Sequence, residues 1–190
     1  MNIGLFFGSF NPVHHGHLII ANHILNDALV DKIWFVVSPQ NPLKETKSLL
    51  NENQRYYLTD LAVADDDRLR VTDVEFSLER PSYTSVTLAY LTEKYPQHRF
   101  FVIMGGDSFQ NITKWKNYEY ILKNYTIILY NRPGFEISER YAADIIEMKA
   151  PLLEISATAI GKLIKEKKSI RYLMPENVIE EIEKGGYYRK

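Results

Sequence analysis

The chain has 190 residues, of which 45% are hydrophobic, and its 23 Lys and Arg nearly balance its 24 Asp and Glu. This length suits a single domain over residues 1–190, and the net charge of -1 lacks the basic excess of proteins that bind nucleic acids mainly through phosphates. The absence of cysteine excludes disulfides and thiolate zinc sites. No apolar run reaches the ~20 residues of a membrane span, and no signal peptide is recognisable, so we expect a cytoplasmic protein.

Apolar runs alternate with helical periodicities along the chain. The pattern predicts, in order, a strand at residues 2–7, a helix from about residue 16 to 29, a strand at 32–38, a helix at 51–64, a strand at 69–74, a helix at 85–95, a strand at 99–104, a helix at 114–123, a strand at 125–130, a helix at 138–148, a strand at 152–155, and helices at 156–167 and 175–184. Because the strands are apolar throughout, the predicted fold is α/β, with a doubly wound parallel sheet, helices on both faces and a small C-terminal helical segment.

Ligands of such sheets bind beyond the carboxyl ends of the strands. The segments that directly follow the predicted strands are therefore the candidate binding segments. They are residues 8–17, 38–44, 105–107, 131–134 and 156–158.

Residues 8–17 read GSFNPVHHGH, after the first predicted strand. Gly8 and Gly16 let the backbone approach a ligand closely, and a helix that starts near Gly16 directs its free N–H groups at anions. His14 and His17 can donate hydrogen bonds to phosphate oxygens that gain charge during a reaction. A single His near a helix start is more often a cap or a surface residue, and a zinc site would need a third ligand that is not evident at metal spacing.

Ser156 stands at the start of a predicted helix and is a good N-cap. Simple capping explains this segment, and a second helix N-terminus that holds phosphates is the functional alternative. The Walker A, dinucleotide-binding and G-x-S-x-G patterns are all missing from the sequence. Their absence argues against a P-loop NTPase, a dinucleotide-binding Rossmann site and an α/β-hydrolase.

Residues 8–17 resemble the G-[ST]-F-[DN]-P-x-H-x-G-H motif of the nucleotidyltransferases with an HxGH motif, and residues 155–160 resemble their I-S-x-T-x-I-R motif. More narrowly, the chain resembles the bacterial nicotinate-nucleotide adenylyltransferases of NAD biosynthesis. The segments that carry this resemblance are PQNPLK at 39–44, Arg55, SYT at 82–84, GGD at 105–107, Trp115, NRPG at 131–134 and RYLMP at 171–175.

The resemblance implies a Rossmann-like fold and a reaction in which nicotinate mononucleotide attacks the α-phosphate of ATP, giving deamido-NAD and pyrophosphate. It implies His14 and His17 as the catalytic residues and Mg²⁺ held by phosphates and water, not by protein side chains. The ATP site would comprise Gly8, Ser9, Phe10, His14, His17, Lys44, Gly105, Asp107, Ser156 and Thr158. The mononucleotide site would comprise Thr84, Trp115 and Arg132.

These residues also have structural interpretations. Trp115 could be helix core, Asp107 could cap a turn, Arg132 could belong to a surface turn, and Lys44 could be solvated. The family motif ends in Arg where this chain has Gly161, which removes a bidentate phosphate donor. Lys162, Lys165 or another basic residue could substitute, or the triphosphate could be held more weakly.

The alternatives in function are another acceptor, such as nicotinamide mononucleotide or phosphopantetheine, and a non-catalytic nucleotide sensor on the same fold. The expected partners are the small molecules ATP and nicotinate mononucleotide, without nucleic acid or membrane. A homo-oligomer is compatible with the sequence.

Overall fold

The computed structural model describes residues 1–189 except residues 28, 41–48, 132–136 and 149–154. The described strands form one sheet, and every neighbouring pair in it is parallel. The strands are β1 (Asn2–Gly8), β2 (Lys32–Val37), β3 (Leu69–Thr72), β4 (Arg99–Gly105), β5 (Thr126–Tyr130) and β6 (Ile145–Met148). The helices are α1 (His15–Asn26), α2 (Glu52–Val63), α3 (Thr84–Lys94), α4 (Gly106–Gln110), α5 (Tyr118–Asn124), α6 (Ala157–Lys165) and α7 (Glu176–Gly185), with 3₁₀ turns η1 (Val74–Phe76) and η2 (Ile112–Lys114).

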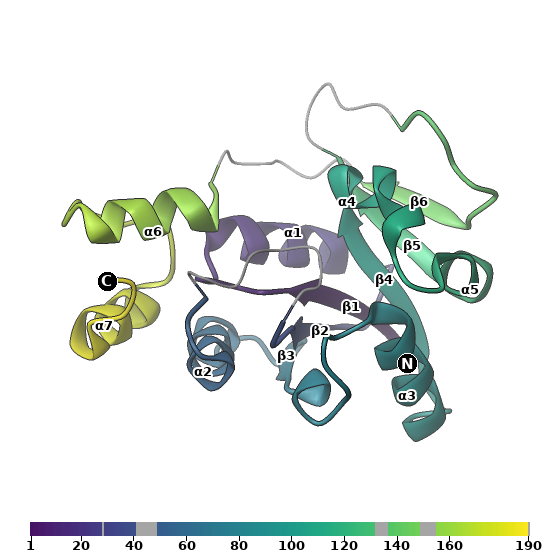
Figure 1. Cartoon of the computed structure of the whole chain (residues 1–190), viewed down its shortest axis with the longest axis horizontal. Coiled ribbons are helices and arrows are strands. Elements are labelled where there is room, and N and C mark those ends of the chain that lie inside the picture. Colours follow the sequence, from purple (N-terminus) through teal and green to yellow (C-terminus); the bar gives the residue numbers. More distant parts are fainter. Residues whose placement is uncertain (28, 41–48, 132–136, 149–154, 190) are drawn as a thin grey trace.

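The strand order is β3-β2-β1-β4-β5-β6, so the sheet grows from β1 in both directions. The chain runs outward through β2 to β3, crosses back through α3, and continues outward again from β4, as Figure 1 shows. This arrangement is a doubly wound, Rossmann-like sheet, which confirms the predicted fold class.

Alternate strand residues supply two separate cores, one on each face of the sheet. In β2, Ile33, Phe35 and Val37 pack with α1, α2, α6 and α7. Trp34 and Val36 point to the other face and pack with α3, α4 and α5. Both faces are therefore covered by helices, which is why the strands read as continuous apolar runs.

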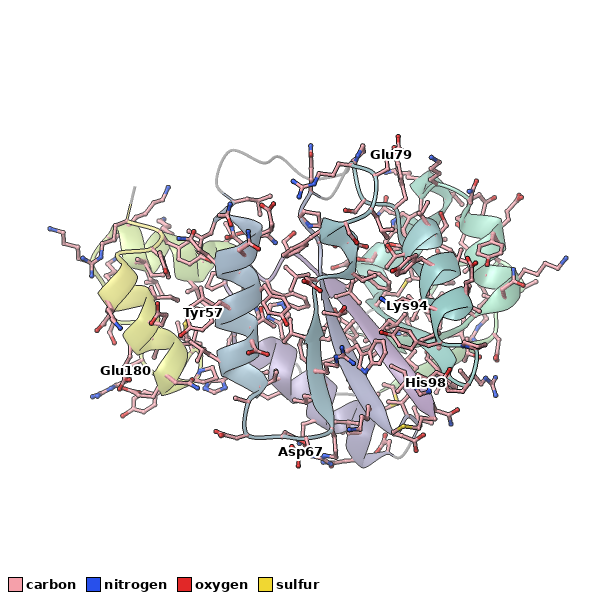
Figure 2. All side chains as sticks on the ribbon, turned by 90° about the horizontal axis from the view of Figure 1, so that it is seen from below. Tyr57, Asp67, Glu79, Lys94, His98 and Glu180 are labelled. Atoms are coloured by element: carbon pink, nitrogen blue, oxygen red, sulfur yellow. The ribbon has the colours of Figure 1, made fainter. Side chains whose placement is uncertain are left out.

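The two ends of the sheet have different surroundings. In Figure 2, Asp67, which precedes β3, lies at the opposite end of the sheet from Glu79, which follows it. Helices α2 and α7 lie side by side, and the Asn177 side-chain amide donates to the Leu61 carbonyl at 2.8 Å across them. Within the described residues, no helix is long and apolar enough to cross a membrane.

The predicted helix at residues 138–148 is wrong. Tyr141 and Ala142 have positive φ angles of 48° and 53°, a conformation that interrupts a right-handed helix, and residues 145–148 form β6 instead. Ile145 pairs with Ile127 of β5, and the Ile127 N–H donates to the Asp144 carbonyl at 2.8 Å. Hydrogen bonding to β5 therefore determines the conformation of residues 145–148, although their apolar residues are spaced as in a helix. The strand predicted at residues 152–155 lies almost entirely outside the described residues.

The helix predicted at residues 114–123 begins four residues later than expected. Helix α5 starts at Tyr118, after Asn117 with a φ angle of 55°. Residues 112–114 instead form η2, and Trp115 follows it in an extended conformation. The segment that carries Trp115 is thus a connection between two short helices, not the body of one.

Candidate active site

A cavity of about 370 Å³ opens at the carboxyl edge of the sheet, beside the ends of β1 and β4. The strand order reverses at β1, so this is the switch point where doubly wound sheets bind ligands. The cavity is lined by five of the residues expected in the site: Gly8, Ser9, Thr84, Gly105 and Trp115.

The turn after β1 is built around the ring of Phe10. Phe10 is 2% exposed and has a φ angle of 43°, which is uncommon for a residue with a side chain. Its ring lies 5.1 Å from the ring of His17 and 5.3 Å from that of Phe35. A Cβ on Gly8 would stand 2.7 Å from the Phe10 ring, so Gly8 is needed for this packing as well as for close approach of a ligand.

His14 and His17 lie together at the start of α1. Their rings stack with centroids 3.8 Å apart. The main-chain N–H of His14 donates to the ring Nδ1 of His17 at 3.2 Å. Because Nδ1 of His17 accepts this bond, the proton of the neutral imidazole resides on Nε2, which becomes a hydrogen-bond donor. A Cβ on Gly16 would lie 2.9 Å from the His14 ring, so the glycine between the two histidines makes room for the stack.

His14 is uncharged at neutral pH. Its side chain is 6% exposed, and burial, together with the neighbouring His15, lowers its pKa from 6.5 to about 4. Its buried Nδ1 has no hydrogen-bond partner among the described residues. A neutral imidazole with an unused ring nitrogen can still take part in a hydrogen bond with a ligand.

The N-terminus of α6 lies next to that of α1, as Figure 1 also shows. The Ile155 carbonyl oxygen is 3.8 Å from the position that a Cβ on Gly16 would occupy. Ser156 caps α6 by accepting a hydrogen bond from the Ala159 N–H at 3.1 Å, as expected, and Thr158 is exposed in the first turn. Two positive helix ends therefore meet at one place, which favours a polyanion.

The C-terminal segment contributes to this end of α1. The N–H of His15 donates to the Leu173 carbonyl at 2.9 Å. This bond satisfies one of the free N–H groups of the first helical turn, and it brings the RYLMP segment against the HxGH turn.

The other side of the cavity is formed by Thr84, at the start of α3, and by the half-buried Trp115. Trp115 packs partly against the second core and also lines the cavity, although it does not lie in a helix. Lys114 and Lys116 flank it and also line the cavity, and Lys116 Nζ lies 4.3 Å from the centroid of the Tyr83 ring. The sequence did not single out these two lysines.

Glu75 also lines the cavity, although it was not identified from the sequence as a site residue. It is 1% exposed, and the Thr87 hydroxyl donates to its Oε1 at 2.8 Å, whereas Oε2 lacks a hydrogen-bond partner within the described parts of the chain. Burial raises the pKa of this carboxyl, and the hydroxyls of Thr87, Ser38 and Ser82 partly oppose the shift. Glu75 follows β3 directly, so the rule that pointed to the other strand ends would have found it.

Gly105, which lines the cavity, ends β4, and a Cβ there would stand 3.2 Å from the Tyr130 ring. Asp107 is not among the lining residues and is exposed in the first turn of α4. Lys44 and Arg132 lie outside the described residues. In the described ranges, no group of three or more His, Asp or Glu is placed to hold a metal ion.

Comparison with known proteins gives a consistent picture. Residues 5–163 match the model of the cytidylyltransferase-like family. A probable nicotinate-nucleotide adenylyltransferase of Cytophaga hutchinsonii is 49% identical, covering 99% of this chain and 98% of its own length. A protein of the same description from Flavobacterium johnsoniae is 46% identical, with both chains covered completely.

Among solved structures, the nicotinic acid mononucleotide adenylyltransferase of Plasmodium falciparum complexed with NaAD has the same fold. Its TM-score is 0.83 at 20% identity, covering 98% of this chain and 97% of that one. The family model matches most of the chain, and the relatives match nearly all of it. This chain belongs to the cytidylyltransferase-like family and, within it, to the group of the nicotinate-nucleotide adenylyltransferases.

Proposed function

We propose that this chain transfers the adenylyl group of ATP to nicotinate mononucleotide, producing deamido-NAD and pyrophosphate in NAD biosynthesis. The observation that carries the proposal is the meeting of two helix N-termini and a stacked His pair beside a cavity at the switch point of the sheet. The cavity volume of about 370 Å³ lies in the range of small-molecule sites. Relatives named for this reaction match over nearly the whole chain.

In the proposed reaction, a phosphate oxygen of the mononucleotide attacks the α-phosphorus of ATP. The bond from the α-phosphorus to the oxygen that bridges to the β-phosphate breaks, and pyrophosphate leaves with that electron pair. The nucleophile is already an anion, so the protein needs no general base and acts by positioning and charge stabilisation. Mg²⁺, when bound by the triphosphate, neutralises part of its charge.

His17 is the residue proposed to act at the α-phosphate. The backbone N–H of His14 donates to its Nδ1, so in the neutral imidazole Nε2–H is the donor proposed to act on a phosphate oxygen. The ring stack with His14 and the edge contact with Phe10 fix its orientation before the substrate binds. A preorganised donor of this kind stabilises charge that develops in the transition state. The free N–H groups at the starts of α1 and α6, with Ser156 and Thr158, are proposed to hold the β- and γ-phosphates.

The mononucleotide is proposed to bind against Trp115, whose ring offers an apolar face in the cavity, and near Thr84. Lys114 and Lys116 supply positive charge at the same wall. Arg132 and Lys44 remain proposed contacts on the basis of the sequence. Gly105 and Asp107 are proposed to hold the adenosine, because both follow β4 at the same edge.

The acceptor is tested by one assay. Pyrophosphate release from MgATP is measured with nicotinate mononucleotide, nicotinamide mononucleotide or phosphopantetheine as the second substrate. We expect release with nicotinate mononucleotide at the highest kcat/KM. Preference for either other acceptor would contradict the proposed substrate, and no release with any of them would favour a nucleotide sensor.

Replacing His17 by Ala should lower kcat by roughly 10²- to 10³-fold, the effect of losing one preorganised donor to a transition state. Steady-state rates of the purified variant measure the effect. His23→Ala, near the other end of α1, is the matched control and should keep the wild-type rate. A His17→Ala enzyme with a near-normal kcat would disprove the role of this imidazole.

The low pKa of His14 predicts a specific pH dependence of stability. Because the pKa is about 4 in the folded chain against 6.5 in the unfolded chain, the unfolded state takes up a proton first as the pH falls. The free energy of unfolding should therefore decrease between pH 6.5 and about 4, by at most about 1.4 kcal/mol per pH unit from this group. Urea titrations of wild type and His14→Asn measure it, and equal slopes in that window would contradict the prediction.

Gly161 provides a test of the phosphate-binding end of α6. A Cβ at this position would meet nothing within 4 Å, so Gly161→Arg should fold, and the guanidinium that the family motif carries would be restored. We expect the KM for ATP to fall roughly two- to fivefold, the scale of one exposed charge pair. Gly161→Ala is the control, since it adds helix propensity without charge. Equal KM values in the Ala and Arg variants would show that position 161 is too far from the triphosphate.

A further inference from the structure

The guanidinium of Arg55 is buried beneath the turn that follows β1. Arg55 lies in α2 and is 1% exposed. Its Nη1 donates to the carbonyls of Ser9 at 2.6 Å and Ser38 at 2.9 Å, and its Nη2 to that of Pro39 at 3.1 Å. Its Nε donates to the Leu50 carbonyl at 2.8 Å. Four of the five N–H donors of a guanidinium are therefore bonded to main-chain oxygens.

These carbonyls belong to three separate segments of the active-site edge. Ser9 follows β1 and lines the cavity, Ser38 and Pro39 follow β2, and Leu50 precedes α2. A single side chain thus connects the turn of the HxGH motif with the loop after the neighbouring strand. The planar fork of Arg suits this task, because one rigid group donates in several directions at once.

The charge of Arg55 is not paired with a carboxylate in the described residues. Glu52, one turn earlier in α2, forms its ion pair with Arg80 at 2.9 Å. Burial lowers the pKa of Arg55, but a guanidinium stays protonated in proteins. In the described residues, the carbonyl oxygens are the direct partners of this buried charge, and Glu52 acts on it only at longer range. A positive charge therefore lies directly behind the turn.

The bonds to the carbonyls fix which way the peptide groups face. In a trans peptide the C=O and the following N–H point in opposite directions, and the peptides after Ser9 and Pro39 are not among the cis bonds. When Arg55 holds the Ser9 carbonyl inward, the Phe10 N–H is turned away from the guanidinium. The same holds for Pro39 and the Gln40 N–H. A charged partner on the carbonyl also polarises the peptide and strengthens its N–H as a donor.

We propose that Arg55 is a positioning residue for the ATP phosphates, which acts through the Ser9–Phe10 and Pro39–Gln40 peptides and does not touch the nucleotide. It aims their N–H groups at the bound phosphates and gives them additional positive character. The inference rests on the proposed adenylyl transfer and adds to it a residue outside the HxGH turn.

The hydroxyl of Tyr188 is part of the surroundings of Arg55. It is buried without a hydrogen-bond partner in the described part of the chain, and the nearby positive charge of Arg55 acts against the rise that burial causes in its pKa. Arg55 itself is only 1% exposed, so water has little access to its guanidinium. Without competing water, the bonds from Arg55 to the carbonyls are stronger.

The first experiment compares Arg55→Lys with Leu58→Ala. Lys keeps the charge but cannot bond all four carbonyls, whereas Leu58, which is 0% exposed in the same helix, serves as a destabilised control that leaves the carbonyl contacts intact. Kinetics are measured at a temperature where circular dichroism shows both variants folded. We expect Arg55→Lys to raise the KM for ATP and the inhibition constant of inorganic pyrophosphate by roughly tenfold or more, as for a lost hydrogen bond to a charged group. The KM for the mononucleotide should change less.

A general loss of stability would reduce the amount of active enzyme, but it would not raise the KM for ATP and the inhibition constant of pyrophosphate more than the KM for the mononucleotide. Arg55→Lys with unchanged ATP and pyrophosphate constants would overturn the inference, as would the same changes in Leu58→Ala. If the wild type itself transfers no adenylyl group to nicotinate mononucleotide, the proposed function fails instead. The two failures are therefore distinguishable.

A second measurement uses the unaltered protein and does not depend on a variant that folds. Magnesium pyrophosphate is titrated into ¹⁵N-labelled protein, and the backbone amide resonances are followed. We expect the Phe10 and Gln40 amides to be among those with the largest shifts and to become protected from hydrogen exchange. Shifts confined to the starts of α1 and α6, with Phe10 and Gln40 unaffected, would show that these peptides do not face the phosphates.

Discussion

The parallel pairing of β1 with both β2 and β4 is the constraint from which the site follows. Because the chain leaves β1 toward β2 and later returns to its other side at β4, the connecting helices cover opposite faces of the sheet. The two connections diverge above the end of β1, and the cavity opens beside the ends of β1 and β4. The cavity, the His pair and the start of α1 all lie at this divergence.

Around the proposed phosphate position, the described residues provide positive potential mainly through groups that cannot move. His14 contributes no charge at neutral pH, because its pKa is lowered to about 4. The positive potential comes instead from the fixed dipoles of the helix ends and from the guanidinium of Arg55, which main-chain carbonyls hold in place. Such groups need little reorganisation when charge shifts from the nucleophile to pyrophosphate, which is how a preorganised site lowers a barrier. A site of flexible surface lysines would lose part of that advantage to side-chain entropy.

The sheet and the start of α1 were predicted from the sequence because they depend on local features, namely apolar runs and the H-x-G-H pattern at residues 14–17. The prediction failed at residues 138–148, where spacing typical of a helix was overridden by strand pairing that only the folded sheet supplies. Glu75 was not identified, although it closely follows the third predicted strand. The contacts of Arg55 could not be predicted, because the carbonyls that it bonds come from segments far apart in the chain. Ser156 was predicted as a cap and is one, since the cap bond involves only the four consecutive residues 156–159.

The bond from His15 to the Leu173 carbonyl has a consequence for how the enzyme is made. The ribosome releases the HxGH turn early, and most of the sheet can form while synthesis continues. The segment whose Leu173 carbonyl completes the first turn of α1 emerges after every described strand of the sheet. A nascent chain can therefore be folded in its centre and still lack its finished nucleotide site.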